Sequence, residues 1–141
     1  MTGPQLLPGA VVPPLERSFP ITRLVAYAGA TWDWHRLHYD TAYAGARDLA
    51  APVVDGQVFG ALLAEQLLDW LGPACVLRSL HFRFARPVFA GESVRCVGKV
   101  TAVDGRLVTV EQSVEVLGPR ARTAVAPAGA LVELREPADG P

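Results

Sequence analysis

The fold of this chain is decided by residues 57–71, which read Gln57-Val58-Phe59-Gly60-Ala61-Leu62-Leu63-Ala64-Glu65-Gln66-Leu67-Leu68-Asp69-Trp70-Leu71. Most of these side chains are apolar, and three of the polar ones, Gln57, Glu65 and Asp69, recur at multiples of four along one narrow edge. A helix with so little polar surface is mostly buried. Asp55-Gly56 opens the predicted helix and Gly72-Pro73 ends it. The sequence therefore predicts one long helix inside the protein.

After this helix the apolar pattern changes from a helical period to the period of two that is typical of strands. Apolar and polar residues alternate over residues 79–84, 94–100 and 108–116. Asp104-Gly105 lies between two of these runs and is a strong signal for a two-residue hairpin. A last strand is predicted over about residues 121–133. We expect an α+β fold in which an antiparallel sheet wraps around the long helix.

The chain before the long helix divides into shorter pieces. Residues 1–14 contain four prolines and predict an extended arm, and Arg17–Pro20 predicts a short edge strand. Thr22 is placed to cap a following helix, and Asp40 is placed to cap a second, short helical turn. The expected element order is β-α-α-β-β-β-β, within a single domain that covers all 141 residues.

Composition excludes several functional classes. The formal net charge is −1, which gives no electrostatic reason to expect a nucleic acid or an anionic membrane as the partner. No apolar run approaches the roughly 18 residues that span a bilayer, and no signal peptide is visible, so a cytoplasmic location is expected. Cys75 and Cys96 are far apart without metal-ligand spacing, which predicts two reduced, buried thiols.

A cluster of titratable residues stands before the long helix. Asp33, His35 and His38 lie within six residues, and a carboxylate with an imidazole is the usual pair for acid–base chemistry near neutral pH. On a regular helix Asp33 and His38 would lie roughly 140° apart and could not act on one bond. If both act together, the chain must leave the helix between them.

Three short motifs follow one another along the chain. Asp33, His38 and Asp40 form an Asp-x4-His-x-Asp pattern, residues 53–56 (Val-Val-Asp-Gly) enter the long helix through a glycine, and residues 84–92 contain Pro-Val followed by Gly-Glu. In this order and spacing they resemble the MaoC-like family of (R)-specific enoyl-CoA hydratases and dehydratases. Within that family the likeness is to the small single-hotdog subunit of steroid side-chain hydratases. The resemblance covers about residues 18–135 and implies the hotdog fold.

The resemblance also implies a reaction and a set of site residues. The reaction is the reversible hydration of enoyl thioesters, bound to coenzyme A or to acyl carrier protein, with Asp33 and His38 as the catalytic dyad. The backbone N–H of Gly56 would stabilise the thioester oxygen. His35 and Asp55 would lie beside these groups and support them without contacting the substrate. No metal and no other cofactor is expected.

The chain departs from the family pattern around the dyad. His35-Arg36 stands where the family usually has Asn-Pro, Asp55 where it often has His, and Ala64 where a small hydroxyl residue is common. These differences affect the expected substrate and rate more than the reaction type. The acyl chain, its carrier, the physiological direction and the pathway stay open.

A partner subunit is expected, because a hotdog sheet has an edge that natural proteins pair or cover. Residues 106–116 are predicted to pair across a two-fold axis with a second copy or with a related hotdog chain. Two other functions remain open on this scaffold. One is a thioesterase, for which Glu65 on the long helix is the candidate carboxylate, or a double-bond isomerase. The other is a non-catalytic, acyl-binding subunit of a hetero-oligomeric hydratase.

Overall fold

The computed structural model describes residues 6–136, which form a five-stranded sheet and several helices. The elements in chain order are β1 (Val11–Ser18), α1 (Ile21–Thr31), the 3₁₀ turn η1 (Arg36–His38), α2 (Thr41–Gly45), α3 (Gln57–Leu71), β2 (Cys75–Phe84), β3 (Ser93–Asp104), β4 (Leu107–Val116) and β5 (Arg122–Leu134). The strands lie in the order β1-β3-β4-β5-β2, and all neighbours are antiparallel. The long helix has the predicted bounds.

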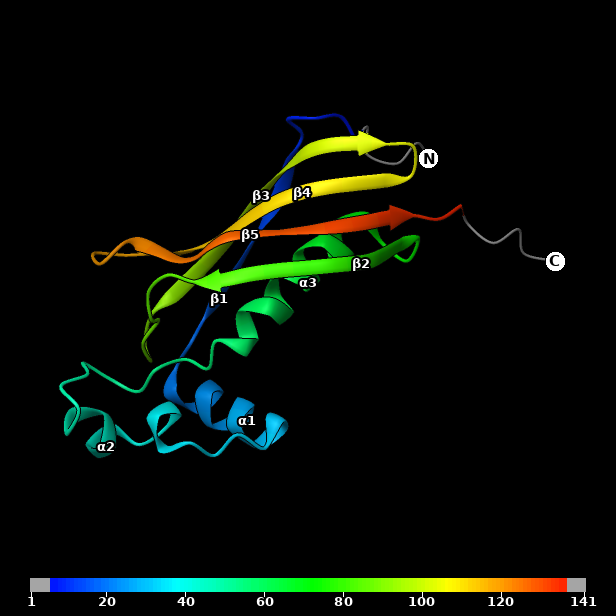
Figure 1. Ribbon diagram of the computed structural model, residues 1–141. Helices are drawn as coiled ribbons and strands as arrows, with labels where there is room; N and C mark the ends of the chain where they lie inside the picture. Colours follow the sequence, from blue (N-terminus) through cyan, green and yellow to red (C-terminus); the bar gives the residue numbers. More distant parts are fainter. Residues whose placement is uncertain (1–5, 137–141) are drawn as a thin grey trace.

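The sheet covers α3, and the two together enclose the core (Figure 1). Leu63 and Leu67 on the helix are completely buried. Every second residue of β4 from Val108 to Val116 is buried as well, as the alternating pattern requires when one face of a strand is covered. The predicted hotdog fold, a sheet wrapped around one buried helix, is therefore confirmed.

Two buried amide side chains fix the register of helix and sheet. Gln66 on α3 donates hydrogen bonds of 3.1 Å to the backbone carbonyls of Pro13 and Cys96. Gln112 on β4 in turn donates to Gln66 Oε1 at 2.9 Å. Because a buried amide without partners is costly, these bonds favour one position of α3 over others that bury equal apolar area.

The start of the chain differs from the prediction. Residues 1–5 of the predicted arm lie outside the described residues, but the arm prediction is wrong for residues 11–14, which begin β1. The predicted strand at Arg17–Pro20 is thus only the end of a longer one. Pro13 and Pro14 fall where the pairing of β1 with β3 shifts register, and they lack the N–H that an inner strand would need. An edge strand tolerates both.

The predicted cap of the first helix is wrong. Helix α1 begins at Ile21, and Pro20 occupies its N-cap position without any side-chain hydrogen bond. The predicted cap of α2 is confirmed, since Asp40 Oδ1 accepts a 3.0 Å hydrogen bond from the Tyr43 N–H. The hairpin is confirmed one residue later than expected, because Asp104 pairs with Leu107 and leaves Gly105 and Arg106 as the turn.

The prediction that residues 106–116 pair with a partner subunit is also wrong. Residues 106–116 form β4, which lies in the middle of the sheet between β3 and β5. Both of its edges are therefore occupied within the chain. The regular alternation that suggested a free edge reflects a strand with one face on the core. The free edges of this sheet are β1 and β2.

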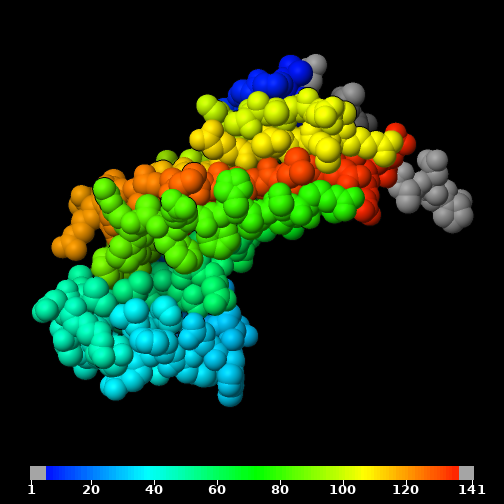
Figure 2. Space-filling model, viewed as in Figure 1, coloured from blue at the N-terminus to red at the C-terminus, as the bar shows by residue number. Residues whose placement is uncertain are grey.

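Helices α1 and α2 lie beyond the N-terminal end of α3, on the side away from the sheet (Figure 1). In Figure 2 this part, coloured cyan, forms a lobe that projects from the sheet. The helices within residues 6–136 are all too short or too polar to cross a membrane. The lobe matters for function because it carries the Asp33–His38 cluster to the open end of α3.

Candidate active site

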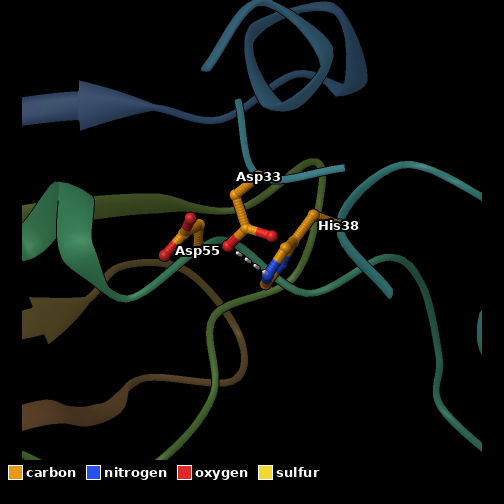
Figure 3. A group of neighbouring side chains, drawn as sticks. All are labelled: Asp33, His38 and Asp55. Atoms are coloured by element: carbon orange, nitrogen blue, oxygen red, sulfur yellow. Dashed lines mark ion pairs between the residues drawn. The ribbon is translucent and has the colours of Figure 1, made fainter. Parts of the chain in front are cut away.

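The chain leaves helix α1 before both dyad residues, and not between them as expected, so the two are not held on one regular helix. Helix α1 ends at Thr31, and Trp32 then adopts a left-handed conformation with φ of 59°. Asp33 follows in the connection, and His38 closes η1. This turn brings Asp33 Oδ2 to 3.8 Å from His38 Nε2, with both side chains only partly exposed (Figure 3).

The backbone fixes the protonation state of one nitrogen of His38. Its Nδ1 lies 2.7 Å from the carbonyl oxygen of Val53. A carbonyl oxygen only accepts hydrogen bonds, so Nδ1 carries the hydrogen and donates it. In the neutral imidazole Nε2 is then the free acceptor, and this is the atom that faces Asp33.

The segment that holds His38 is itself anchored by the predicted Pro-Val motif. Val54 N–H donates to the carbonyl of Val88 at 2.8 Å, and Val53 forms a bridge with Phe89. Glu92 fastens the same loop, because its Oε1 accepts hydrogen bonds from the Phe89 N–H and from Arg122. The hydrogen bonds from Arg122 lower the pKa of Glu92 below its usual range. The motif therefore positions the entry to α3.

Asp55 has a second carboxylate oxygen with no evident structural use. Its Oδ1 accepts a 3.0 Å hydrogen bond from Gln57 N–H and so caps the first residue of α3. Its Oδ2 is buried and has no hydrogen-bond partner among residues 6–136. Figure 3 shows Asp55 beside Asp33 and His38, and one ligand atom of each residue lies within 4.8 Å of the other two.

Tyr27 on α1 was not predicted as a site residue, although it lines the same cavity. Burial raises the pKa of Tyr27, and the nearby charge of Asp55 raises it further. A sequence signal for this residue existed, because Leu24 and Ala28 are the buried positions of α1 and Tyr27 lies beside them on the helix. The hydroxyl group adds a polar atom to a wall that also contains Asp33 and Asp55.

Gly56 stands at the N-cap of α3. A Cβ atom at this position would lie 2.5 Å from Cζ of Phe84, so glycine is needed to admit this ring. Within the described part of the chain the Gly56 N–H donates no hydrogen bond. Phe84 is another residue that the sequence did not single out, and no local pattern marks it apart from other strand residues.

Two pockets meet at the dyad. The first has a volume of about 170 Å³ and lies between α1 and α3. Its lining includes apolar side chains, Tyr27, Asp33, Asp55 and two arginines, Arg17 and Arg23. The second has a volume of about 310 Å³ and is lined by Gly56, Phe84 and Arg86, among others. His38 and Val54 belong to both walls. A ligand that fills both pockets therefore passes His38.

The other predicted candidates lie outside these pockets. His35 is exposed, and its Nδ1 accepts a 3.1 Å hydrogen bond from Leu37 N–H, so it caps η1. Asp40 is paired with Arg36 at 2.8 Å in addition to its capping bond. Glu65 forms an ion pair with Arg17. His35 supports the turn that carries His38 without facing the cavity.

A metal site would draw on Asp33, His38 and Asp55. Zinc holds ligand atoms about 2.0–2.2 Å away, so the ligand atoms lie within about 3.6 Å of each other in a tetrahedral site. The present spread of up to 4.8 Å is wider than that. The arrangement suits three groups around a small polar ligand better than three ligands on zinc.

Comparison with known proteins agrees with this architecture. Residues 11–118 match the family of the MaoC like domain. The beta subunit of 3-oxo-4,17-pregnadiene-20-carboxyl-CoA hydratase from Mycobacterium tuberculosis is 32% identical over 106 residues, which cover 73% of this chain and 80% of that protein.

Two solved structures share the fold over nearly the whole chain. The ChsH1-ChsH2 complex from Mycobacterium tuberculosis contains a chain with a TM-score of 0.82 and 29% identity, covering 93% of this chain and 100% of that one. The (R)-hydratase from A. caviae has a TM-score of 0.84 and 26% identity, covering 94% and 99%. With its matched domain, its hotdog fold and its ordered motifs, the chain belongs to the MaoC-like family.

Proposed function

We propose that this protein catalyses the reversible addition of water to enoyl thioesters, with Asp33 and His38 as the catalytic dyad. The observation that carries the proposal is the pairing of Asp33 Oδ2 and His38 Nε2 at 3.8 Å where two pockets meet. The family membership and the hydratases among its relatives support the same reaction.

The dyad acts on the water that adds to C3. Because His38 Nδ1 donates to Val53, the imidazole offers Nε2 as a base, and the carboxylate of Asp33 lies beside it. One proton of the water moves to the dyad while the water oxygen bonds to C3. The π electrons move towards C2 and the thioester oxygen. The dyad then returns a proton to C2, and dehydration follows the reverse path.

The negative charge that builds on the thioester oxygen needs a donor placed in advance. Gly56 offers a backbone N–H at the start of α3, where the helix dipole also favours negative charge. Asp55 caps Gln57 and leaves the Gly56 N–H available. In this arrangement the thioester lies in the second pocket, next to Gly56, with the acyl group in the first.

The size of the first pocket limits the acyl group. A cavity of about 150 Å³ holds one benzene molecule, and the first pocket has about 170 Å³. Its wall is mostly apolar, with Phe19, Leu24 and Leu62 among the lining residues. We therefore expect short enoyl groups of about six carbons to fit better than a four-ring steroid.

The alternatives receive less support. A thioesterase using Glu65 would need that carboxylate free and near the substrate, but it is paired with Arg17 and lines neither pocket at the dyad. A double-bond isomerase adds no water, so it would not need a place for a water molecule at the dyad. A non-catalytic acyl-binding subunit would not need both dyad side chains to converge on one cavity.

A hotdog partner forms part of the proposal. The fold is shared with one chain of a two-protein complex from M. tuberculosis, so a second copy or a related chain is expected to complete the assembly. A carrier of the acyl group, coenzyme A or acyl carrier protein, would bind at the open side of the second pocket. The buried, reduced Cys75 and Cys96 fit a cytoplasmic setting.

The test is a spectroscopic assay that follows loss of the enoyl-thioester absorbance. Crotonyl-CoA, hexenoyl-CoA, a long-chain enoyl-CoA and a steroid enoyl-CoA are compared, with the Asp33→Asn protein as the control. We expect turnover of the short substrates and formation of the 3-hydroxyacyl product. Release of free coenzyme A without hydration would instead support a thioesterase.

A further inference from the structure

Asp55 Oδ2 is an unpaired, buried acceptor beside the dyad. The residue is 9% exposed, and the oxygen has no hydrogen-bond donor among residues 6–136. Native proteins rarely leave a buried carboxylate oxygen without a donor, and the exceptions mark functional sites or bound ligands. The capping role does not explain it, because capping uses only Oδ1.

The position of Asp55 indicates which kind of hydrogen-bond donor can bind to its Oδ2. The residue lines the first pocket together with Asp33 and His38, and one ligand atom from each lies within 4.8 Å of the others. Figure 3 shows the three side chains close together, with Asp33 between Asp55 and His38. A small molecule with two O–H bonds, such as water, can donate to more than one of these acceptors at once.

We propose that Asp55 is a third catalytic residue. Its Oδ2 accepts a hydrogen bond from the O–H group of the adding water that stays intact in the reaction. The inference rests on the proposed hydratase function. In hydration one O–H proton passes to the Asp33–His38 dyad as the C3–O bond forms. The other stays on oxygen and becomes the 3-hydroxyl proton, which donates to Asp55. In dehydration the same contact holds the 3-hydroxyl before it leaves as water.

This contact has a mechanistic effect. A water bound only to the dyad can rotate about that hydrogen bond, whereas a second acceptor fixes where its lone pair points. Fixing the attacking group before the reaction lowers the barrier. The contact also distinguishes a 3-hydroxyacyl thioester from a saturated acyl thioester, because only the former has a proton to donate to Asp55.

The first experiment compares Asp55→Asn with the wild type. Asparagine retains an oxygen that can cap Gln57, so the fold is kept, but its amide replaces the free acceptor by a donor. We expect kcat to fall at least about tenfold with an unchanged melting temperature. The matched control is Asp40→Asn, the same change at the cap of α2, which lies outside both pockets. Equal kcat in all three proteins would overturn the proposal.

A second measurement reads binding and separates this inference from the proposed function. Because an active hydratase would dehydrate 3-hydroxybutyryl-CoA, calorimetry compares this thioester with butyryl-CoA in the Asp33→Asn protein, with and without Asp55→Asn. The Asp33→Asn protein is expected to bind the hydroxylated thioester about tenfold more tightly, and the double variant is expected to lose this difference. If the wild type hydrates no enoyl-CoA, the proposed function fails while this comparison still tests Asp55. Equal binding of the two thioesters by the Asp33→Asn protein would overturn the inference.

Discussion

Asp33 Oδ2 and His38 Nε2 face each other at 3.8 Å, which is too long for a direct hydrogen bond. The gap exists because the other polar atom of each side chain is hydrogen-bonded to the backbone. Asp33 Oδ1 accepts the His35 N–H at 3.3 Å, and His38 Nδ1 donates to Val53. The remaining oxygen and nitrogen are thus directed at a common space, where a water can donate to either.

The first prediction follows from this geometry. Asp33→Asn and His38→Ala are each expected to lower kcat at least about 10²-fold while the fold persists, because each removes a group that moves a proton. The double variant should be little worse than the worse single one, since groups that act as a unit are not additive. Steady-state kinetics and circular dichroism measure both effects. Normal turnover in the two single variants would refute the dyad.

The second prediction concerns the ion pair of Glu92 and Arg122, whose side chains are only 19% and 13% exposed. Glu92→Gln is expected to destabilise the fold by about 2 kcal/mol at pH 7, because the pair holds the loop that anchors the entry to α3. The pKa of Glu92 is lowered in the fold, mainly by its hydrogen bonds to Arg122. Its contribution is therefore present above the unfolded pKa of about 4.3 and is lost as the pH falls through the lower folded value.

Denaturant unfolding of Glu92→Gln and wild type between neutral and acidic pH measures this effect. The difference in the free energy of unfolding should be constant near neutrality and should shrink at acidic pH. Glu16→Gln is the control, since its pair with Arg95 is much more exposed. A difference that stays constant down to the lowest pH would contradict the assignment.

The sequence allowed the central helix and the proximity of Asp33 and His38 to be predicted because both signals are local. Both can be seen in short stretches of sequence: the period of 3.6 over residues 57–71, and the spacing of Asp33 and His38. Strand order was not predictable in this way, so residues 106–116 were assigned to a free edge that they do not occupy. Phe84 and the free oxygen of Asp55 were also missed, since their roles arise from neighbours that only the folded chain supplies.

The third prediction names β2, in place of residues 106–116, as the strand that pairs with the partner subunit. Of the two free edges, β1 contains Pro13 and Pro14, whereas β2 contains neither proline nor glycine, so every residue of β2 keeps its backbone N–H. We expect the partner to pair along β2. Light scattering should give at least twice the mass of the 15.1 kDa chain. Hydrogen exchange should show protection of the β2 amides that an unpaired edge would expose. A stable, active monomer would refute the pairing.

The fourth prediction concerns the carrier. Arg86 lines the second pocket, is exposed and forms no ion pair within residues 6–136. Arg86→Gln should raise KM for an enoyl-CoA about 3- to 5-fold, as loss of one exposed phosphate contact would, with little change in kcat. Arg106→Gln is the control, because Arg106 lies in the β3–β4 turn and pairs with Glu136. The enoyl-pantetheine thioester lacks the nucleotide phosphates, so its KM should not differ between the variants. An equal increase in KM with this substrate would contradict a phosphate contact.

The last prediction concerns the helix entry, where Gly56 and Phe84 share one space. Gly56→Ala would place Cβ about where the Phe84 ring lies, 2.5 Å from its Cζ. Phe84 is 59% exposed, so its ring can move away with little loss of stability, but it would move within the pocket assigned to the thioester. We therefore expect kcat/KM to fall at least about tenfold with a nearly unchanged melting temperature. Gly45→Ala, where no atom lies within 4 Å of the added carbon, should behave as wild type.

The double variant Gly56→Ala/Phe84→Ala separates the two ways in which Gly56 can act. Alanine keeps the backbone N–H, so removal of the ring should restore most of the activity if only the collision with Phe84 matters. If Cβ itself blocks the thioester from the N–H, activity stays low in the double variant, and Gly56→Val should be worse than Gly56→Ala because the β-branched side chain obstructs more of the pocket. Wild-type kcat/KM in both Gly56→Ala and Gly56→Val would show that the thioester does not approach this N–H, and the oxyanion site would then have to lie elsewhere.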